Sequence, residues 1–588
     1  MDRLSFLCLK SRGGVFRPGF FFGLIDAFFV VCLFLCCILG RSYLFVAHAV
    51  QPKGYCFIGL VSLWAICRFI LLGKKLHTRS LSIDLITIGW LIICLYILWR
   101  ICSSEIIRPW SVCLLISGFT LFCLVRSTTE IVVIHLGDGL CILANLILSG
   151  ITLWQYLIYG RSTGPFDNPA GLAICMTALF PFLLCRVFDS AKKCKKQFLV
   201  LLGLNIIAII LTESRTGVLA MISVSGIFFY NRHVGWLKQI LKYPKFILSC
   251  LFIILATAVF YINTESAKGR LLIWKITGDM IAEAPLLGGG AGIFAARYMD
   301  TQADFFQEHP DHPMMMLADN VSYPFNEYLN FIAAYGLIGF ILCLFWVLFV
   351  ISRTKAVSSY LLSLIAVSIT SLFSFPFRYA STLLLVVWCL GCLARSYMSV
   401  GIRFSIRQSV VFRTGATLSL LGCLYLMITD LRFEYRWGQL TRSSGNYDTM
   451  AYQELSTRWN GNPYFLYNYG VTLFYLGTYE NALRVMQKCQ TYLNDYDVEM
   501  ILGECYAQLN QTRQAKKSYI QASLMCPNRF MPLYKLVEIY DRIGLSEQAL
   551  EVAHEILDKP EKVPSCTVIT IKRKMQQRIR QQSNRDNT

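Results

Sequence analysis

The chain has few charged residues, and acidic residues are the scarcer kind. Charged residues make up 15% of its 588 residues, against about a quarter of an ordinary soluble domain. The hydrophobic share of 55% therefore points to a membrane protein rather than to a soluble enzyme. The 55 Lys and Arg exceed the 35 Asp and Glu, but the basic residues gather in short loops between apolar runs, so the formal charge of +20 does not indicate nucleic-acid binding.

Motifs of metal and cofactor sites are also missing. The 23 cysteines mostly lie inside apolar runs, where a free cysteine behaves as a small apolar residue, and no pair of CxxC motifs occurs. No D-x-D carboxylate pair occurs in residues 1–430, and the two histidines of EHPDHP, His309 and His312, lack a clear third ligand. The glycine run of PLLGGGAGIF, residues 285–294, follows no predicted strand and matches no nucleotide fingerprint, so it predicts a tight turn. We expect neither a metal nor a cofactor.

Long apolar runs fill most of residues 1–430. A helix of about 20 apolar residues crosses a bilayer, so these runs predict an all-α polytopic membrane bundle. We expect about 13 spans, at residues 20–40, 54–73, 81–99, 110–125, 138–158, 170–188, 197–212, 215–230, 244–262, 325–350, 357–375, 380–395 and 414–430.

Basic residues alternate in density from one loop to the next. If the N-terminus is cytoplasmic, the loops on that side are rich in Lys and Arg, as in the KKCKK segment at 192–196, whereas the opposite loops are sparse. The positive-inside rule then places the long, net acidic loop 264–324 on the outer side of the membrane. It also places Arg161, Arg215 and Arg378 there, together with the C-terminal part of the chain.

The composition changes at about residue 431 to that of a polar, helical region. Its small residues recur, with Ala482, Ala515 and Ala549 at spacings of 33 and 34 residues. This period is typical of tetratricopeptide repeats, helical hairpins that stack into a grooved array. We expect such repeats at 431–565, where the groove would hold a partner protein or the acceptor substrate, followed by a basic, disordered tail at 566–588.

Three segments in and beside the polar loop resemble a known family. GRLLIW (269–274), PLLGGGAGIF (285–294) and FNEYLNFIAAYGLIG (325–339) are similar to the shared core of bacterial O-antigen ligases and O-antigen polymerases, over about residues 155–395. The resemblance implies a GT-C-like glycosyltransferase in the bacterial inner membrane. Such an enzyme would take a glycan from a polyprenyl-diphosphate donor at the periplasmic face and transfer it to an acceptor hydroxyl.

The resemblance also implies which cations hold the donor. Arg215 in LTESRTG, Arg161 in GRSTGPFDNPAGLA and Arg270 in GRLLIW match the places where the family binds diphosphate. A guanidinium suits this task because it is always charged and is bidentate to phosphate oxygens. In the Arg161 segment, Asp167 or Asn168 is expected to cap the helix that follows. Positive charge from arginines would make a metal unnecessary.

The residue that takes the acceptor proton stays open. Phe325 stands where the family has a histidine, although Asn326 is kept. Glu327, His309 and His312 are alternatives as base, yet Glu327 equally suits the first turn of a helix and the two histidines equally suit an exposed loop. This departure puts a standard ligase mechanism in doubt.

Several functions remain compatible with the sequence. The donor would be a polyprenyl-diphosphate-linked glycan, and the acceptor a glycan, a lipid or a protein, so polysaccharide ligation, polymerisation and protein O-oligosaccharide transfer all stay possible. A transporter of such lipids predicts charges near mid-span and paired internal repeats, and neither is clear. A non-catalytic assembly scaffold would not need about 13 spans.

Overall fold

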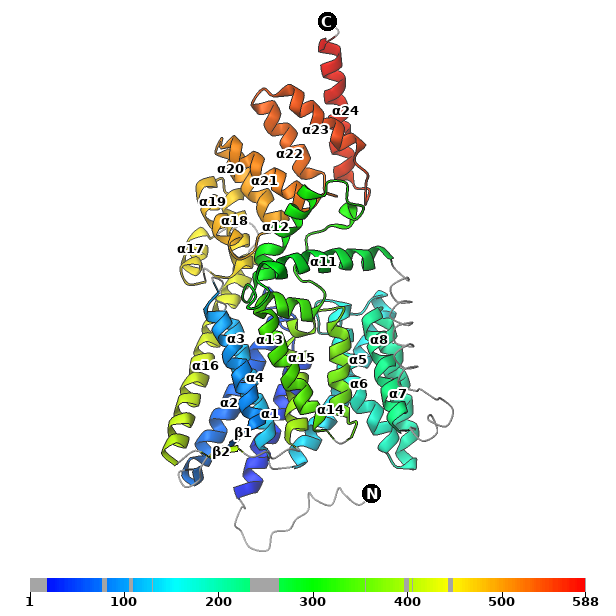
Figure 1. The fold of residues 1–588 in the computed structure, drawn as a ribbon, viewed down its shortest axis with the longest axis vertical. Coiled ribbons are helices and arrows are strands. Elements are labelled where there is room, and N and C mark those ends of the chain that lie inside the picture. The colour runs from blue at the N-terminus through cyan, green and yellow to red at the C-terminus, as the bar shows by residue number, and fades with distance from the viewer. Residues whose placement is uncertain are drawn as a thin grey trace.

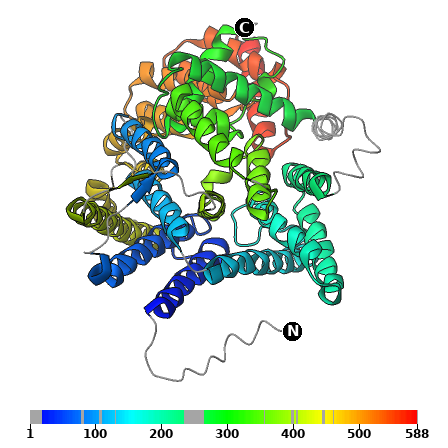
Figure 2. The ribbon, with the colours of Figure 1, turned by 60° about the horizontal axis from the view of Figure 1, so that its bottom comes forward.

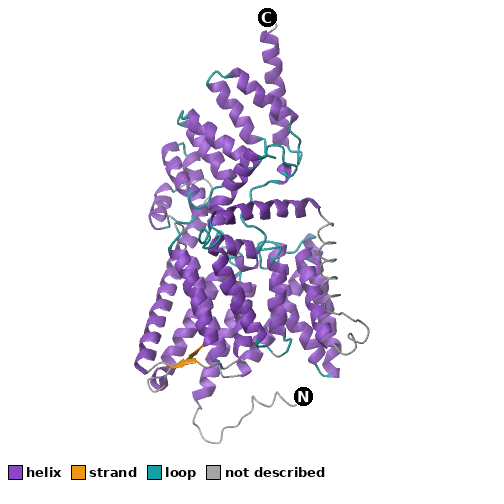
Figure 3. Ribbon diagram, viewed as in Figure 1, coloured by secondary structure: helices purple, strands orange, loops and turns teal. Residues whose placement is uncertain are grey.

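Helices account for almost all of the regular structure of the chain (Figures 1 and 3). The computed structural model describes residues 18–76, 82–104, 109–128, 131–232, 264–354, 356–395, 401–403, 406–442, 448–459 and 461–586. They form three parts: an apolar helix bundle, a polar insert at one end of the bundle, and a stack of shorter helices beyond the insert (Figure 1).

Twelve helices coincide with predicted spans, and the thirteenth predicted span, 244–262, lies outside the described residues. Eight of the described helices are long and apolar enough to cross a membrane, and three more are apolar but shorter. The bundle is thus that of a multi-pass membrane protein. Its helices are α1 (Pro18–Leu39), α2 (Gln51–Leu76), α3 (Leu85–Cys102), α4 (Pro109–Ser127), α5 (Ile131–Tyr159), α6 (Pro169–Asp189), α7 (Lys192–Leu211), α8 (Arg215–Arg232), α13 (Glu327–Ser352), α14 (Ser359–Ser371), α15 (Ala380–Arg395) and α16 (Ile406–Arg442).

Helix α6 lies at the centre of this bundle. Its span is 83% buried, the largest share among the eight long apolar helices, because α5, α7, α8, α14 and α15 pack around it. The pair α7 and α8 lies at one side of the bundle and α16 at the other (Figures 1 and 2). Two short strands, β1 (Ser82–Asp84) and β2 (Gly401–Arg403), pair antiparallel at the end of the bundle away from the insert (Figure 3).

The polar insert forms two helices and a short 3-10 turn. Helix α11 (Thr264–Glu283) lies across the end of the bundle, and α12 (Ile293–Glu308) and η2 (Met315–Leu317) follow it (Figure 1). The glycine run between α11 and α12 is a tight turn, as predicted. Gly288 and Gly290 have φ values of 70° and 93°, which favour glycine.

This glycine turn is hydrogen-bonded to α13 at a kink in that helix. The backbone N–H groups of Gly289 and Gly290 donate to the carbonyls of Ala333 and Ala334, at 2.8 and 2.9 Å. Gly336 has a non-helical φ of 69°, and a Cβ on it would lie 2.1 Å from the Leu286 carbonyl oxygen. Glycine at 336 is therefore required by the close approach of the two backbones.

The stack beyond the insert consists of antiparallel helix pairs. Ala482, Ala515 and Ala549 are fully buried where the helices of three successive pairs cross. The period read from the sequence therefore corresponds to a helix pair, and we keep the assignment to tetratricopeptide repeats as a proposal. The helices are α17 (Thr449–Arg458), α18 (Pro463–Tyr475), α19 (Tyr479–Gln490), α20 (Tyr496–Gln508), α21 (Thr512–Met525), α22 (Met531–Arg542), α23 (Ser546–Asp558) and α24 (Cys566–Asp586).

Two expectations for this part were wrong. Residues 566–586 form helix α24 rather than a disordered tail, because Ile571 and Met575 are buried against the preceding helices. The expected boundary at 430 and 431 falls inside α16, which continues unbroken from the membrane bundle to Arg442. The composition of the tail, which is basic and rich in glutamine, suggested disorder. It hid the apolar residues that recur along one side of this helix.

The insert is docked on the helix stack. Tyr298 and Phe306 of α12 share an apolar core with Tyr496, Met525 and Cys526 of the stack. The loop predicted as a connection between spans is therefore held from both sides, by α13 on the bundle side and by α20 and α21 on the other.

Candidate functional site

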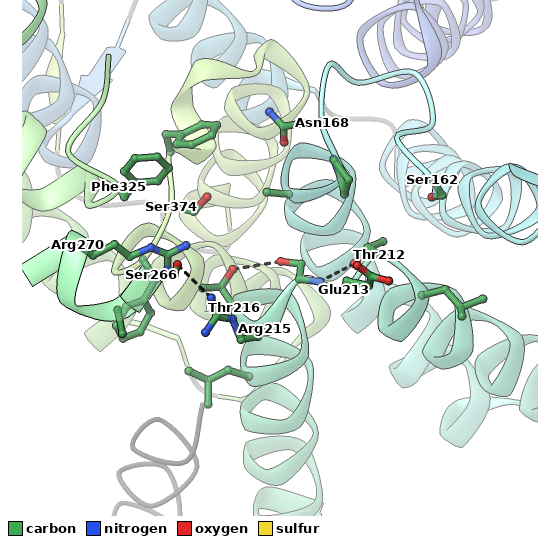
Figure 4. Close-up of a pocket in the computed structure, with 18 of the residues that line it drawn as sticks. Ser162, Asn168, Thr212, Glu213, Arg215, Thr216, Ser266, Arg270, Phe325 and Ser374 are labelled. Carbon is green, nitrogen blue, oxygen red and sulfur yellow. Dashed lines mark hydrogen bonds between the residues drawn. The ribbon is translucent and has the colours of Figure 1, made fainter. Parts of the chain in front are cut away.

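A cavity of about 560 Å³ lies where the insert meets the end of the bundle (Figure 4). Its wall is built from the loop before α6, the turn between α7 and α8, helix α11, Phe325, and the segment after α14. Arg161, Arg215 and Arg270, the three arginines predicted to bind diphosphate, all line it. They come from segments that are about 50 residues apart in the chain, so only the fold brings them together.

The turn between α7 and α8 carries Arg215. The chain reverses within three residues, Thr212 to Ser214, as the sequence predicted. The Thr212 hydroxyl donates to the Ile209 carbonyl at 2.6 Å, and the Ser214 hydroxyl accepts from the backbone N–H of Gly217 at 3.3 Å. Ser214 thereby caps α8, and Arg215 follows as its first residue.

The segment that carries Arg161 is held by two cations and a helix cap. The Lys53 ammonium donates to the Pro165 carbonyl at 2.9 Å, and the Arg41 guanidinium donates to the Gly164 carbonyl at 3.3 Å. Asn168, one of the two predicted caps, accepts from the backbone N–H of Gly171 at 2.8 Å and so begins α6.

Helix α11 supplies Arg270 from the opposite wall (Figure 4). The Arg270 guanidinium lies 5.6 Å from the centre of the Phe325 ring, and Arg215 donates to the Ser266 hydroxyl of the same helix at 3.2 Å. Burial, and then the positive charge of Arg215, lower the pKa of Arg270. A dianionic group between the two guanidinium groups would relieve this repulsion.

Arg378 lies beside the cavity but does not line it. It belongs to the short 3-10 helix η3 (Pro376–Arg378) and forms an ion pair with Asp167 at 2.8 Å. The Tyr379 hydroxyl donates to the same carboxylate at 2.7 Å. The charge of Arg378 is thus already used to hold the η3 segment against the loop before α6.

The residues expected near the acceptor have local structural contacts and lie outside the described lining of the cavity. The Asn326 side chain caps α13 by accepting from the N–H groups of Tyr328 and Leu329, at 3.0 and 3.1 Å. The Glu327 carboxylate accepts from the backbone N–H of Phe377 at 3.0 Å and from the Asn330 side chain at 3.2 Å. Phe325, at the position of the family histidine, does line the cavity.

The two loop histidines pack together around one aromatic ring. His309 stacks on Phe305 with ring centres 4.7 Å apart, and His312 lies edge-on to the same ring at 5.1 Å. Neither lines the described cavity. Burial lowers the pKa of His312, and the charges of Lys275 and His309 lower it further. Their role as a base stays a prediction without support from this arrangement.

Glu213 is a cavity residue that the sequence analysis missed. It lies in the turn before Arg215, is exposed, and has a φ of 57°. Its place in LTESRTG, two residues before Arg215 at the end of a span, was the available signal. Among the described residues, no group of three or more His, Cys, Asp and Glu side chains that could hold a metal is present.

A family model described as O-antigen ligase matches residues 198–344. The match covers most of α7, all of α8, α11 and α12, and the larger part of α13, so it includes Arg215 and Arg270 but not Arg161. No curated protein matches the chain at a significant level. The apolar helices identify the chain as a multi-pass membrane protein, and the matched region is similar to the O-antigen ligase family, which supports a general role in glycan transfer in O-antigen ligation.

Proposed function

We propose that this protein transfers a glycan from a polyprenyl-diphosphate carrier to an acceptor hydroxyl at the periplasmic face of the bacterial inner membrane. One observation carries the proposal: Arg161, Arg215 and Arg270 line a single cavity at the end of the membrane bundle. The alternation of basic loops supports the orientation, since the cavity and the helix stack lie at the end of the bundle where the loops between spans carry fewer Lys and Arg than at the other end.

The cavity supports binding of a lipid-linked diphosphate. Its lining combines the three guanidinium groups with apolar side chains, which include Leu219, Leu271 and Trp274. Guanidinium groups neutralise the charge that develops on the diphosphate as its bond to the sugar breaks, and this electrostatic help is a large part of transferase catalysis. We propose that three arginines suffice for this neutralisation and that transfer needs no metal.

The proposal specifies the acceptor group, a hydroxyl, but not the molecule that carries it. A hydroxyl of a lipid-linked core, of a growing polysaccharide or of a protein would each fit the reaction, so protein O-oligosaccharide transfer is the alternative. The helix stack acts on the site indirectly, through the insert, because it packs against α12, and α12 packs against the cavity helix α11. A partner or acceptor would then bind to another face of the stack.

The test is release of polyprenyl diphosphate by the purified full-length protein. It is supplied with lipid-linked glycan and acceptor-containing membranes, both extracted from its own host, and wild type is compared with Arg215→Ala. We expect the variant to lose about 100-fold or more in rate, because one missing donor at such a site costs about 10²–10³.

Arg297→Ala is the matched control, because Arg297 is an exposed arginine of the insert that does not line the described cavity. It should retain the wild-type rate. A ladder of product lengths would indicate polymerisation, and a single addition would indicate ligation or protein glycosylation. No release by well-folded wild type would refute the transferase and leave transport or scaffolding.

A further inference from the structure

Glu213 is the only carboxylate among the described residues that line the cavity. The lining holds no His, Asp, Lys, Tyr or Cys in the described part of the chain, and apart from the Trp274 N–H, which can only donate, the remaining side-chain polar groups belong to Arg, Ser, Thr and Asn. None of these is a good proton acceptor near neutral pH, since the hydroxyls and amides are very weak bases and arginine stays charged. A carboxylate accepts hydrogen bonds and protons, so the cavity contains one candidate for this task.

The backbone fixes Glu213 at the cavity. Its N–H donates to the Ile210 carbonyl at 2.9 Å, and the next N–H, of Ser214, donates to the Thr212 hydroxyl at 3.4 Å. The φ of 57° is unusual for a residue with a side chain and costs about 1–2 kcal/mol relative to the right-handed helical region. A glycine would avoid this cost, so the carboxylate is present at a position where backbone conformation disfavours it.

The side chain of Glu213 is not used to hold the fold. Within the described residues, its carboxylate takes part in no hydrogen bond or ion pair, whereas Thr212 and Ser214 on either side both support the turn. Glu327, the carboxylate expected from the sequence, already accepts two hydrogen bonds and lies outside the described lining. The carboxylate with no role in the fold is therefore one that lines the cavity, in the turn before Arg215 (Figure 4).

The negative charge of Glu213 does not prevent the cavity from attracting a diphosphate. Three arginines and one glutamate leave the cavity lining with a formal charge of +2, enough to attract a diphosphate. Glu213 is separated from Arg215 by one residue, and both residues line the cavity.

We propose that Glu213 is the catalytic base that accepts the proton of the acceptor hydroxyl; this inference rests on the proposed function and names a residue for its proton transfer. The acceptor oxygen forms a bond to the anomeric carbon, and the bond from that carbon to the diphosphate oxygen breaks. The bonding electrons leave with the diphosphate, which the arginines hold. The hydroxyl proton moves to a carboxylate oxygen of Glu213 and is then released to water.

The experiment measures polyprenyl diphosphate release in the full-length protein, with the host lipid-linked glycan as donor and host membranes as the source of acceptor. Glu213→Gln keeps the shape and removes the base, and Glu213→Gly also removes the backbone cost. Both should lower kcat by about 10²–10⁴, the usual contribution of a general base, while KM for the donor stays near its wild-type value. Thermal unfolding of Glu213→Gly should occur at or above the wild-type temperature, so misfolding cannot account for the loss.

Rescue separates proton transfer from a structural role. Added formate should restore part of the activity of Glu213→Gly, because a small carboxylate can occupy the vacated space, and chloride at the same ionic strength should not. Glu265→Gln is the matched control, since Glu265 is an exposed carboxylate of α11 outside the described lining. It should leave the rate unchanged.

Three outcomes would overturn the assignment of Glu213. Retention of activity within threefold in Glu213→Gln would do so, as would a loss confined to KM. A loss in Glu327→Gln, with activity kept in Glu213→Gln, would move the base to the start of α13. These results differ from failure of the proposed function, in which wild type releases no diphosphate or Arg215→Ala releases it at the wild-type rate.

Discussion

Lys53 shows how one buried cation can act on the site from a distance. It is fully buried in α2, and its ammonium lies 2.9 Å from the Pro165 carbonyl and 3.5 Å from the centre of the Phe166 ring. These contacts hold the loop that carries Arg161, although Lys53 does not line the cavity. We therefore regard it as a positioning residue.

Replacing Lys53 by methionine should weaken catalysis by about 10- to 100-fold, because a small displacement of a binding group costs this much. The measurement is kcat/KM for polyprenyl diphosphate release. A double-variant cycle with Arg161→Ala decides the mechanism: if Lys53 acts through Arg161, the double variant should be little worse than Arg161→Ala alone. Fully additive losses would contradict this role.

For Phe325 and the two residues after it, the sequence predicted the location but not the direction of the side chains. The family resemblance placed it at the position of a histidine, and the structure places it in the cavity wall against Arg270. The sequence could not show that Asn326 and Glu327 turn away to cap α13 and to hold the Phe377 backbone. That direction depends on a φ of 51° at Phe325, a conformation that is uncommon for a residue with a side chain.

Among the helices, α12 is the element that joins the insert to the helix stack. Gln302 is 1% exposed, and its amide donates to the Met525 carbonyl of α21 at 2.6 Å and to the Asp319 carbonyl at 3.2 Å. The Tyr298 hydroxyl donates to the Gln302 side-chain oxygen at 2.8 Å. A single buried amide thus connects three segments.

Gln302→Leu should lower the free energy of unfolding by about 1–3 kcal/mol, because buried carbonyl and hydroxyl groups lose their partner. Limited proteolysis should then cut the segment 309–326 faster than in wild type, since this segment depends on the docking of α12. Gln307→Leu is the control, because Gln307 is exposed on the same helix. Equal proteolysis of the two variants would show that the amide does not secure the insert.

For the whole molecule, two exposed cysteines at opposite ends report its orientation. Cys194 lies near the start of α7, at the basic end of the bundle, and Cys566 begins α24 beyond the helix stack. In spheroplasts, a membrane-impermeant thiol reagent should modify Cys566 and spare Cys194, because we propose that the stack is periplasmic. Peptide mass spectrometry provides the measurement.

Permeabilised membranes are the control for this labelling, and there both cysteines should react. Modification of Cys194 but not of Cys566 in intact spheroplasts would reverse the orientation. The arginine cavity would then face the cytoplasm, and transfer at the periplasmic face would have to be abandoned.

The membrane character and the approximate positions of the spans could be predicted from the sequence alone, and the three arginines could be named from it as candidates. Apolar runs specify spans because a bilayer leaves backbone groups no partner outside a helix. The helix spacing after residue 442 was also visible, because small residues must recur where helices cross. These features are local in the chain, so a single sequence records them.

Which of these residues lie together depends on the packing of segments that are distant in the chain. Arg161, Arg215 and Arg270 share a cavity because the loop before α6, the α7–α8 turn and α11 converge there. The same convergence brings Glu213 into the cavity and leaves Glu327 outside its described lining. The order of α24 and the docking of α12 likewise depend on apolar partners distant in the chain, which local composition does not reveal.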